Sequence, residues 1–284
     1  MWPKMHSDFD KKTIILVVSP GRSGQASFSS VLEQAFPSAY VAFEEPQIDY
    51  ILPKKLSFLE RKFRRKFLET DELLGRGKVL KAFENSDFKK LQTYGDAKVD
   101  WLLRKMHQKN ANVAFEVNKH LLHGLHIGMQ NTPNIEFKMI ELVRNPLNNM
   151  RSFLNRNKNF YLDNSPPDCV NNELIISREG LTKGQLYLHA WCECYLRARR
   201  FCKHKGIELL SIRSSDLENP KIVRNLLEKL SIPISRLENF DKINTNSVLG
   251  YGKTVVTKKD VSDAELFWRK IPNEIAANLP EFNF

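Results

Sequence analysis

The sequence predicts an α/β fold of three layers, in which a central parallel sheet is flanked by helices. Short apolar runs alternate with segments of helical periodicity along most of the chain. This alternation is typical of parallel sheets, because parallel neighbours need a long crossover connection, which is usually a helix. Hydrophobic residues make up 42% of the chain, which is enough to form a core on both faces of such a sheet.

The predicted strands are short runs in which apolar residues follow one another without regular alternation. This pattern is typical of strands that are covered on both faces, as the strands of a parallel sheet are. We expect strands over residues 13–19, 39–43, 112–117, 136–143 and 207–212.

The predicted helices lie between these strands, and two of them begin at an Asn-Pro pair. In Asn145-Pro146 and Asn219-Pro220 the Asn is suited to cap the helix and the Pro to occupy its first position. The tail after Thr245 is weakly helical and is a candidate closing flap. We expect helices over residues 24–35, 56–74, 146–156, 181–204 and 220–230, and at least one more within 86–108.

Length and composition set the broad class of the protein. We expect a single domain over residues 1–284, with helical insertions near 53–110 and 158–205. The 44 Lys and Arg exceed the 33 Asp and Glu and give a net charge of +11, which favours an anionic partner. A signal peptide and a transmembrane run are not apparent, so we expect a cytoplasmic protein. The four cysteines have no Cys-x-x-Cys pairing, so we expect reduced thiols and no structural zinc.

The first predicted strand ends in a loop that is suited to hold an anion. Gly21 and Gly24 allow sharp turns that bring backbone N–H groups close to a ligand. The helix that follows directs its positive end to the same place. Ser23 and Ser27 add hydroxyl groups, and Arg22 adds a fixed charge. The alternative is an ordinary strand-to-helix turn.

The loop does not match the motif that binds nucleoside triphosphates. That motif ends in Gly-Lys followed by Ser or Thr, and the lysine contacts the β- and γ-phosphates. Here Gln25 follows Gly24, and no Gly-Lys pair occurs at the required spacing. A metal-dependent nucleotide kinase with a degenerate loop is therefore an alternative rather than the first expectation.

A second strand–helix junction carries another candidate for anion binding. Arg144 is placed at the carboxyl end of the strand over 136–143, where parallel sheets bind their ligands. Ser152 follows eight residues later, about two helical turns along the next helix. An Arg and a Ser in this arrangement are able to hold one phosphate together.

The two junctions together resemble the signatures of the sulfotransferase family that uses 3′-phosphoadenosine 5′-phosphosulfate (PAPS). Residues 19–24 are similar to its first signature, although Gln25-Ala26 replace the usual hydroxyl pair. Arg144-Asn145-Pro146 with Ser152 is similar to its second signature. The resemblance implies a P-loop-like fold, PAPS as co-substrate, its 3′,5′-bisphosphate (PAP) as product, and no metal. It implies that the 5′-phosphosulfate contacts Gly21, Arg22, Ser23, Gly24, Gln25, Ala26 and Ser27, and the 3′-phosphate contacts Arg144 and Ser152.

Three other stretches extend the resemblance. Residues 207–233 are similar to the family's late strand and Pro-opened helix, with Ser214 or Ser215 where an aromatic often stands. Residues 39–52 are similar to the second strand of carbohydrate-modifying members, which ends in Glu-Pro. Lys253 lies in a Gly-Tyr-Gly-Lys stretch that is similar to a late loop closing over the 3′-phosphate.

Sulfuryl transfer needs a general base for the acceptor hydroxyl and positive charge at the leaving oxygen. Arg22 is expected to supply that charge. Glu45, at a strand end, is the first candidate for the base, and strand alternation directs Glu44 the other way. The second candidate lies in Asn118-Lys119-His120, which is similar to the family's Lys-Thr-His. Whether Lys119 or His120 matches its family counterpart stays open.

The expected partner is a hydroxyl-bearing acceptor that contains sugar. Residues 52–69 form a basic amphipathic segment, which either packs on the core or contacts an anionic acceptor or membrane surface. His123 and His126 continue from His120 at i+3 spacing, but without acidic or Cys ligands no metal site is expected. We expect no nucleic acid, although a non-catalytic binder of nucleic acid or membranes is the second alternative. The oligomeric state is left open.

Overall fold

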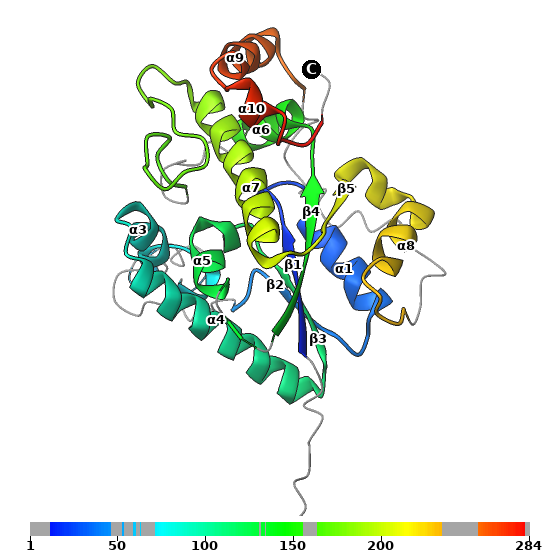
Figure 1. Ribbon diagram of the computed structural model, residues 1–284. Coiled ribbons are helices and arrows are strands. Elements are labelled where there is room, and N and C mark those ends of the chain that lie inside the picture. The colour runs from blue at the N-terminus through cyan, green and yellow to red at the C-terminus, as the bar shows by residue number, and fades with distance from the viewer. Residues whose placement is uncertain are drawn as a thin grey trace, which may run out of the picture.

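The computed structural model describes residues 12–46, 53, 59–60, 63, 72–130, 132–133, 135–155, 164–234 and 255–281. Its centre is a sheet of five parallel strands in the order β2-β3-β1-β4-β5 (Figure 1). The strands are β1 (Lys12–Val18), β2 (Tyr40–Phe43), β3 (Val113–Val117), β4 (Ile135–Val143) and β5 (Leu209–Arg213). The predicted α/β fold of three layers is confirmed, and every predicted strand is present with its ends shifted by at most two residues.

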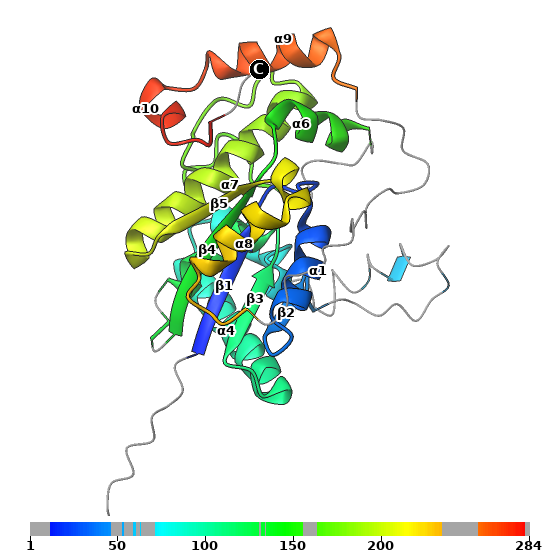
Figure 2. The ribbon, with the colours of Figure 1, turned by 90° about the vertical axis from the view of Figure 1, so that its right-hand side faces the viewer.

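Helices cover both faces of the sheet, and each face has its own buried cluster (Figures 1 and 2). One face packs against α1 (Gln25–Ala35) and α8 (Pro220–Glu228). The other packs against α3 (Lys78–Glu84), α4 (Phe88–Lys109), α5 (Leu125–Met129) and the C-terminal half of α7 (Lys183–Lys205). The 3-10 turns are η1 (Glu72–Leu74), η2 (Leu121–His123) and η4 (Ser214–Glu218).

A third buried cluster lies beyond the carboxyl end of β4. It joins α6 (Pro146–Leu154), the N-terminal half of α7 and α9 (Lys258–Trp268), with Trp191 and Tyr195 among its largest members. The short helix α10 (Asn273–Ala276) packs beside it (Figure 2). The helices of the C-terminal tail thus cover the end of the sheet where parallel strands place their ligand sites.

The two helix starts predicted from Asn-Pro pairs are confirmed by their caps. The Asn145 side chain accepts a hydrogen bond from the Asn148 N–H, and the Asn219 side chain caps α8 in the same way. At the start of α7, Thr182 and Gln185 cap each other reciprocally. Such caps satisfy N–H groups that have no partner inside the helix.

Helices α4 and α5 are in backbone contact. A Cβ atom added to Gly95 would lie 2.5 Å from the Gly128 Cα, closer than such atoms approach in proteins. Because the obstacle is backbone, it cannot swing away as a side chain would. The two glycines therefore set how closely α4 lies against α5.

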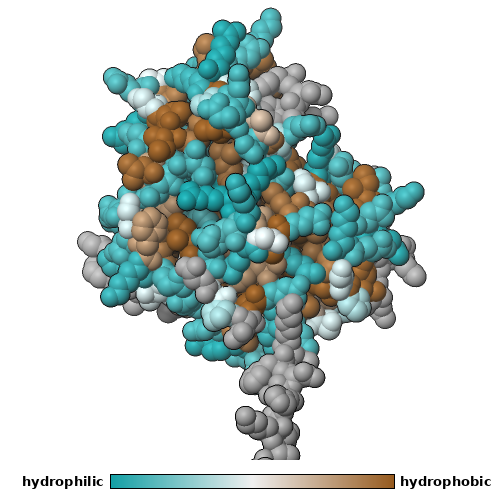
Figure 3. Space-filling model, in the orientation of Figure 1, coloured by the Kyte–Doolittle hydropathy of each residue, from teal (hydrophilic) through white to brown (hydrophobic). Residues whose placement is uncertain are grey.

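Two predicted features fall outside the described residues. The basic segment over 52–69 is described only at Pro53, Leu59, Glu60 and Phe63, and the loop that contains Lys253 is not described. Over the ranges that are described, no helix combines the length and apolar character needed to cross a bilayer. All four cysteines are free and buried. On the face shown in Figure 3, hydrophilic side chains surround scattered hydrophobic patches.

Candidate functional site

The loop between β1 and α1 turns twice through the left-handed region of backbone conformation. Arg22 has φ 75° and Gly24 has φ 90°. Gly24 is the N-cap of α1 and brings no side-chain cap, so the first N–H groups of this helix are not satisfied in the usual way. A left-handed φ is uncommon for a residue with a Cβ, as Arg22 has, and often marks a functional loop.

Four consecutive carbonyl groups of this loop accept hydrogen bonds from side chains of the protein body or of the loop itself. A trans peptide directs its N–H opposite to its C=O, so the N–H groups of residues 21–24 point away from these donors. Successive backbone N–H groups that are left facing outward are suited to bind an anion. The carbonyls of Pro20, Gly21, Arg22 and Ser23 accept, in that order, from Ser23 Oγ (2.7 Å), Tyr187 Oη (2.9 Å), Arg144 Nη1 (2.5 Å) and Ser214 Oγ (2.6 Å).

The Ser23 hydroxyl is used inside this arrangement. It donates to the Pro20 carbonyl and accepts from Asn149 Nδ2 at 2.7 Å, and Asn149 in turn contacts the Tyr187 hydroxyl. The expectation that this hydroxyl donates to an anion is therefore wrong, because its proton is committed to the loop. Ser23 still offers its backbone N–H.

Gln25, the first residue of α1, carries an unsatisfied donor. Its side chain is 5% exposed, and its amide nitrogen has no hydrogen-bond partner among the described residues. A buried donor without a partner is costly, and such groups are often satisfied by a ligand or water. The residue that replaces a hydroxyl in the family signature is thus itself a candidate anion contact. Ala26 and Ser27 follow in the first turn of α1 and are half-buried.

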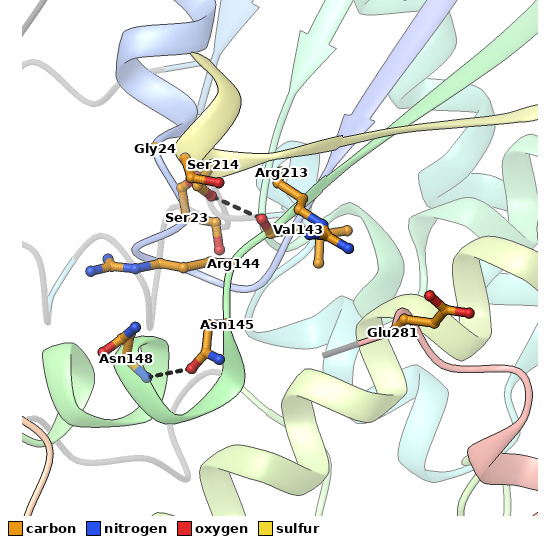
Figure 4. Close-up of a pocket in the computed structure, with 10 residues that line it drawn as sticks. Ser23, Gly24, Val143, Arg144, Asn145, Asn148, Arg213, Ser214 and Glu281 are labelled. Atoms are coloured by element: carbon orange, nitrogen blue, oxygen red, sulfur yellow. Dashed lines mark hydrogen bonds between the residues drawn. The ribbon is translucent and has the colours of Figure 1, made fainter. Parts of the chain in front are cut away.

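A cavity of about 660 Å³ adjoins the loop on the side of β4 and β5. Arg144, Arg213 and Val143, the last residue of β4, line this cavity, and in Figure 4 the side chains of the two arginines extend in opposite directions. Burial lowers the pKa of Arg144, which nevertheless stays charged, so its guanidinium is a poorly hydrated cation suited to pair with an anion. The lining residues are Ser23, Gly24, Val143, Arg144, Asn145, Asn148, Arg213, Ser214, Ser215 and Glu281.

Ser152 lies on α6 one turn beyond Asn148, at the i+4 position on the same face of the helix. It is 8% exposed and is not among the residues that line the cavity. The structure therefore places Ser152 next to the cavity wall and Arg144 on the cavity itself.

The opposite flank of the loop carries a carboxylate and an ammonium group. Lys119, just past the end of β3, forms an ion pair with Glu44 at 2.5 Å, and both side chains are about a third exposed. The aliphatic part of Lys119 lies against the loop, since a Cβ atom on Gly21 would be 3.2 Å from Lys119 Cδ. Lys119 thus contacts the loop.

The expectation that Glu45 rather than Glu44 faces this site is wrong. Glu44 has φ 47°, which ends the regular alternation of β2 and turns its side chain toward Lys119. The Glu45 carboxylate instead contacts the Tyr40 hydroxyl. The alternation of side chains along a strand does not predict these directions, because Glu44, directly after β2, has a left-handed backbone.

His120 does not join Lys119 at the loop. It is 4% exposed, and its ring lies 5.1 Å from the ring of His123. Lys119 rather than His120 therefore lies against the loop. In the described part of the chain, no group of three His, Cys, Asp or Glu side chains is placed to hold a metal ion.

Sequence reasoning missed several residues of this site, among them three that hold or line it. Tyr187 and Asn149 hold the loop from α7 and α6, and Arg213 lines the cavity from the end of β5. Tyr187 belongs to the buried face of a long amphipathic helix, where an aromatic residue is typical of a core. Comparison with known protein families and with curated proteins found no match to this chain.

Proposed function

We propose that the protein is a sulfotransferase, which moves the sulfuryl group of PAPS to an acceptor hydroxyl by in-line transfer. The observation that carries this proposal is the placement of one anion-binding loop between two different flanks. An arginine-lined cavity lies on the side of β4 and β5. A carboxylate–ammonium pair lies on the side of β2 and β3. The first flank suits a phosphorylated nucleotide, and the second suits the chemistry at an acceptor.

The nucleotide half of the proposal uses the loop and the cavity. The outward N–H groups of residues 21–24 and the start of α1 hold the 5′-phosphosulfate. Arg144 pairs with the 3′-phosphate, with Ser152 beside it and Lys253 from the late loop. The cavity volume of about 660 Å³ falls among the 300–1,000 Å³ of typical small-molecule sites.

The acceptor half uses Glu44 and Lys119. The acceptor oxygen forms a bond to sulfur while the bond from sulfur to the 5′-phosphate oxygen breaks, and PAP leaves with that electron pair. Glu44 takes the proton of the acceptor hydroxyl. Lys119 and Arg22 stabilise the charge that grows on the leaving phosphate. The acceptor in this proposal is a carbohydrate or glycoconjugate hydroxyl, in line with the Glu-Pro end of β2.

Calorimetry with PAP and with adenosine 5′-monophosphate tests the nucleotide half. We expect micromolar binding of PAP, at least tenfold tighter than binding of the monophosphate, because the 3′-phosphate pairs with Arg144. Arg144→Ala removes this preference. Arg200→Ala is the matched control, since Arg200 pairs with Glu173 on the exposed surface of α7.

Equal affinity for the two nucleotides in the unaltered protein would refute the proposal. Magnesium-dependent ATP turnover without preference for a 3′-phosphate would replace it with the kinase alternative. Binding that depends steeply on salt and ignores the nucleotide would favour a non-catalytic polyanion binder. Transfer of radiolabelled sulfate from PAPS to a panel of carbohydrates then identifies the acceptor.

A further inference from the structure

A fully buried ion pair lies beneath the end of the sheet that carries Glu44 and Lys119. Lys98 of α4 and Glu116 of β3 are 2.8 Å apart, and both side chains are 0% exposed. The Lys98 ammonium also donates to the Glu45 carbonyl at 2.8 Å and lies 4.5 Å from the centre of the Trp101 ring. The Lys98 ammonium therefore has three partners inside the protein: a carboxylate, a carbonyl and an aromatic ring.

Stability alone does not account for this pair. Burial lowers the pKa of Lys98 and raises the pKa of Glu116, while each group opposes the shift of the other. The free energy lost when two charges leave water is about as large as the free energy gained from their attraction. Apolar residues of similar size therefore often stabilise a core equally well. A buried pair of this kind is better explained by the position it imposes on its neighbours.

The hydrogen bond from Lys98 to the Glu45 carbonyl helps to fix the turn at Glu44. The Glu44 N–H donates to the Val117 carbonyl at 3.0 Å, and Lys98 holds the next carbonyl, that of Glu45. The left-handed backbone of Glu44 is thus fixed on both sides. A strained residue keeps its conformation only when its surroundings determine it in this way.

The contact of Glu116 with Asn118 fixes the backbone before Lys119. Asn118 donates from its side chain to Glu116 Oε1 at 3.0 Å and to the Leu74 carbonyl at 3.2 Å. Its side-chain oxygen accepts from the His120 N–H at 2.8 Å. The same buried pair therefore reaches both residues of the exposed Glu44–Lys119 pair, one through a carbonyl and the other through Asn118.

We infer that Lys98 and Glu116 are positioning residues, which set the Glu44–Lys119 pair against the anion-binding loop. The inference rests on the proposed function for its catalytic meaning. The geometric part of the inference is that the position of the Glu44–Lys119 pair depends on the Lys98–Glu116 pair. This part is tested independently of any reaction.

The test replaces both charges at once, as Lys98→Met with Glu116→Met, so that no lone charge is left in the core. We expect a folded protein that still binds PAP, with an affinity loss smaller than the loss in kcat, because the cavity on the other flank is untouched and only the contact from Lys119 changes. We expect kcat for sulfuryl transfer to fall at least tenfold, and a crystal structure to show Glu44 and Lys119 separated. Asn118→Ala, which leaves the buried pair in place, is expected to lower kcat in the same direction.

The matched control is Arg199→Met with Glu141→Met. This ion pair also joins a helix to a strand, at 2.9 Å, but neither residue contacts the Glu44 turn or Asn118. It is expected to keep kcat within twofold. If the Lys98 and Glu116 variant keeps its kcat, or its Glu44–Lys119 contact, the inference is overturned. If this variant and Asn118→Ala both fail to fold, the network serves stability, and the inference is overturned as well. A protein without affinity for PAP would refute the proposed function alone, because the crystal structure still tests the geometry.

Discussion

The guanidinium of Arg144 donates a hydrogen bond to the backbone carbonyl of Arg22 over 2.5 Å, although 121 residues lie between them in the chain. The ends of β1 and β4 are adjacent in the sheet, which explains how the two segments meet. In the proposed function Arg144 therefore has two tasks: it pairs with the 3′-phosphate, and it holds the loop that binds the 5′-phosphosulfate.

Because of this double role, we expect the loss of Arg144 to weaken binding even of ligands that lack a 3′-phosphate. We expect Arg144→Ala to weaken PAP binding at least tenfold, about 1.4 kcal/mol. Adenosine 5′-phosphosulfate, which has no 3′-phosphate, should bind about threefold more weakly to the variant, because its loop loses one anchor worth roughly 0.7 kcal/mol. Calorimetry with both ligands measures the two effects. An unchanged affinity for adenosine 5′-phosphosulfate would mean that Arg144 acts on the 3′-phosphate alone.

Tyr187 is expected to affect ligand affinity only through the loop, because its hydroxyl bonds the loop backbone and not the ligand. Tyr187→Phe removes the hydroxyl that bonds the Gly21 carbonyl, so we expect PAP affinity to fall about three- to tenfold, or 0.7–1.4 kcal/mol. Tyr195→Phe is the control on the same helix, since its hydroxyl bonds the Leu142 carbonyl within the sheet at 2.9 Å. Both variants should lower the melting temperature, but only Tyr187→Phe should change affinity. Equal affinities in the two variants would contradict this role of the loop.

The two carboxylates at the end of β2 give a paired prediction for catalysis. Glu44→Gln should lower kcat by about 10²–10⁴, the usual contribution of a general base. Glu45→Gln leaves the Glu44–Lys119 pair in place and should have a smaller effect, because Glu45 contacts Tyr40 instead. Rates of sulfuryl transfer at saturating PAPS measure both. A larger loss in Glu45→Gln than in Glu44→Gln would restore Glu45 as the base.

His126 predicts a loss of stability in acid. Burial, with the nearby charge of Arg197, lowers the pKa of His126 from 6.5 to about 3. The unfolded chain therefore takes up the proton first, so stability is full above pH 6.5 and falls as the pH drops toward 3. Each pH unit in this window costs at most about 1.4 kcal/mol. Thermal melts of His126→Gln between pH 7 and 5 should show a smaller decline than those of the unaltered protein, whereas His107→Gln, at an exposed position, should not differ.

The sequence contained enough information for the sheet and for the convergence of Arg22 with Arg144. Buried parallel strands appear as continuous apolar runs. Arg144 follows one such run directly, and Arg22 follows another after three residues of the loop. Strand ends of a parallel sheet share one edge, so the meeting of these two segments follows from the fold class alone.

The remaining details depend on geometry that has no pattern in the sequence. A single left-handed residue turns Glu44, rather than Glu45, toward Lys119, and Glu is not a residue type that signals such a conformation. The Ser23 hydroxyl bonds a carbonyl three residues before it, which no spacing rule separates from a hydroxyl that binds a ligand. Tyr187 and Asn149 reach the loop only because α6 and α7 pack over the end of the sheet.

The contact of Gly95 with Gly128 bears on residues well beyond these two helices. Lys98 lies one turn after Gly95, so the separation of α4 from its neighbour also fixes how far the buried ammonium reaches toward the sheet. A methyl group at either glycine would clash with backbone atoms of the other helix and push the two helices apart. The resulting shift of α4 would move the Lys98 ammonium relative to the sheet, and with it the hydrogen bond that holds the Glu45 carbonyl.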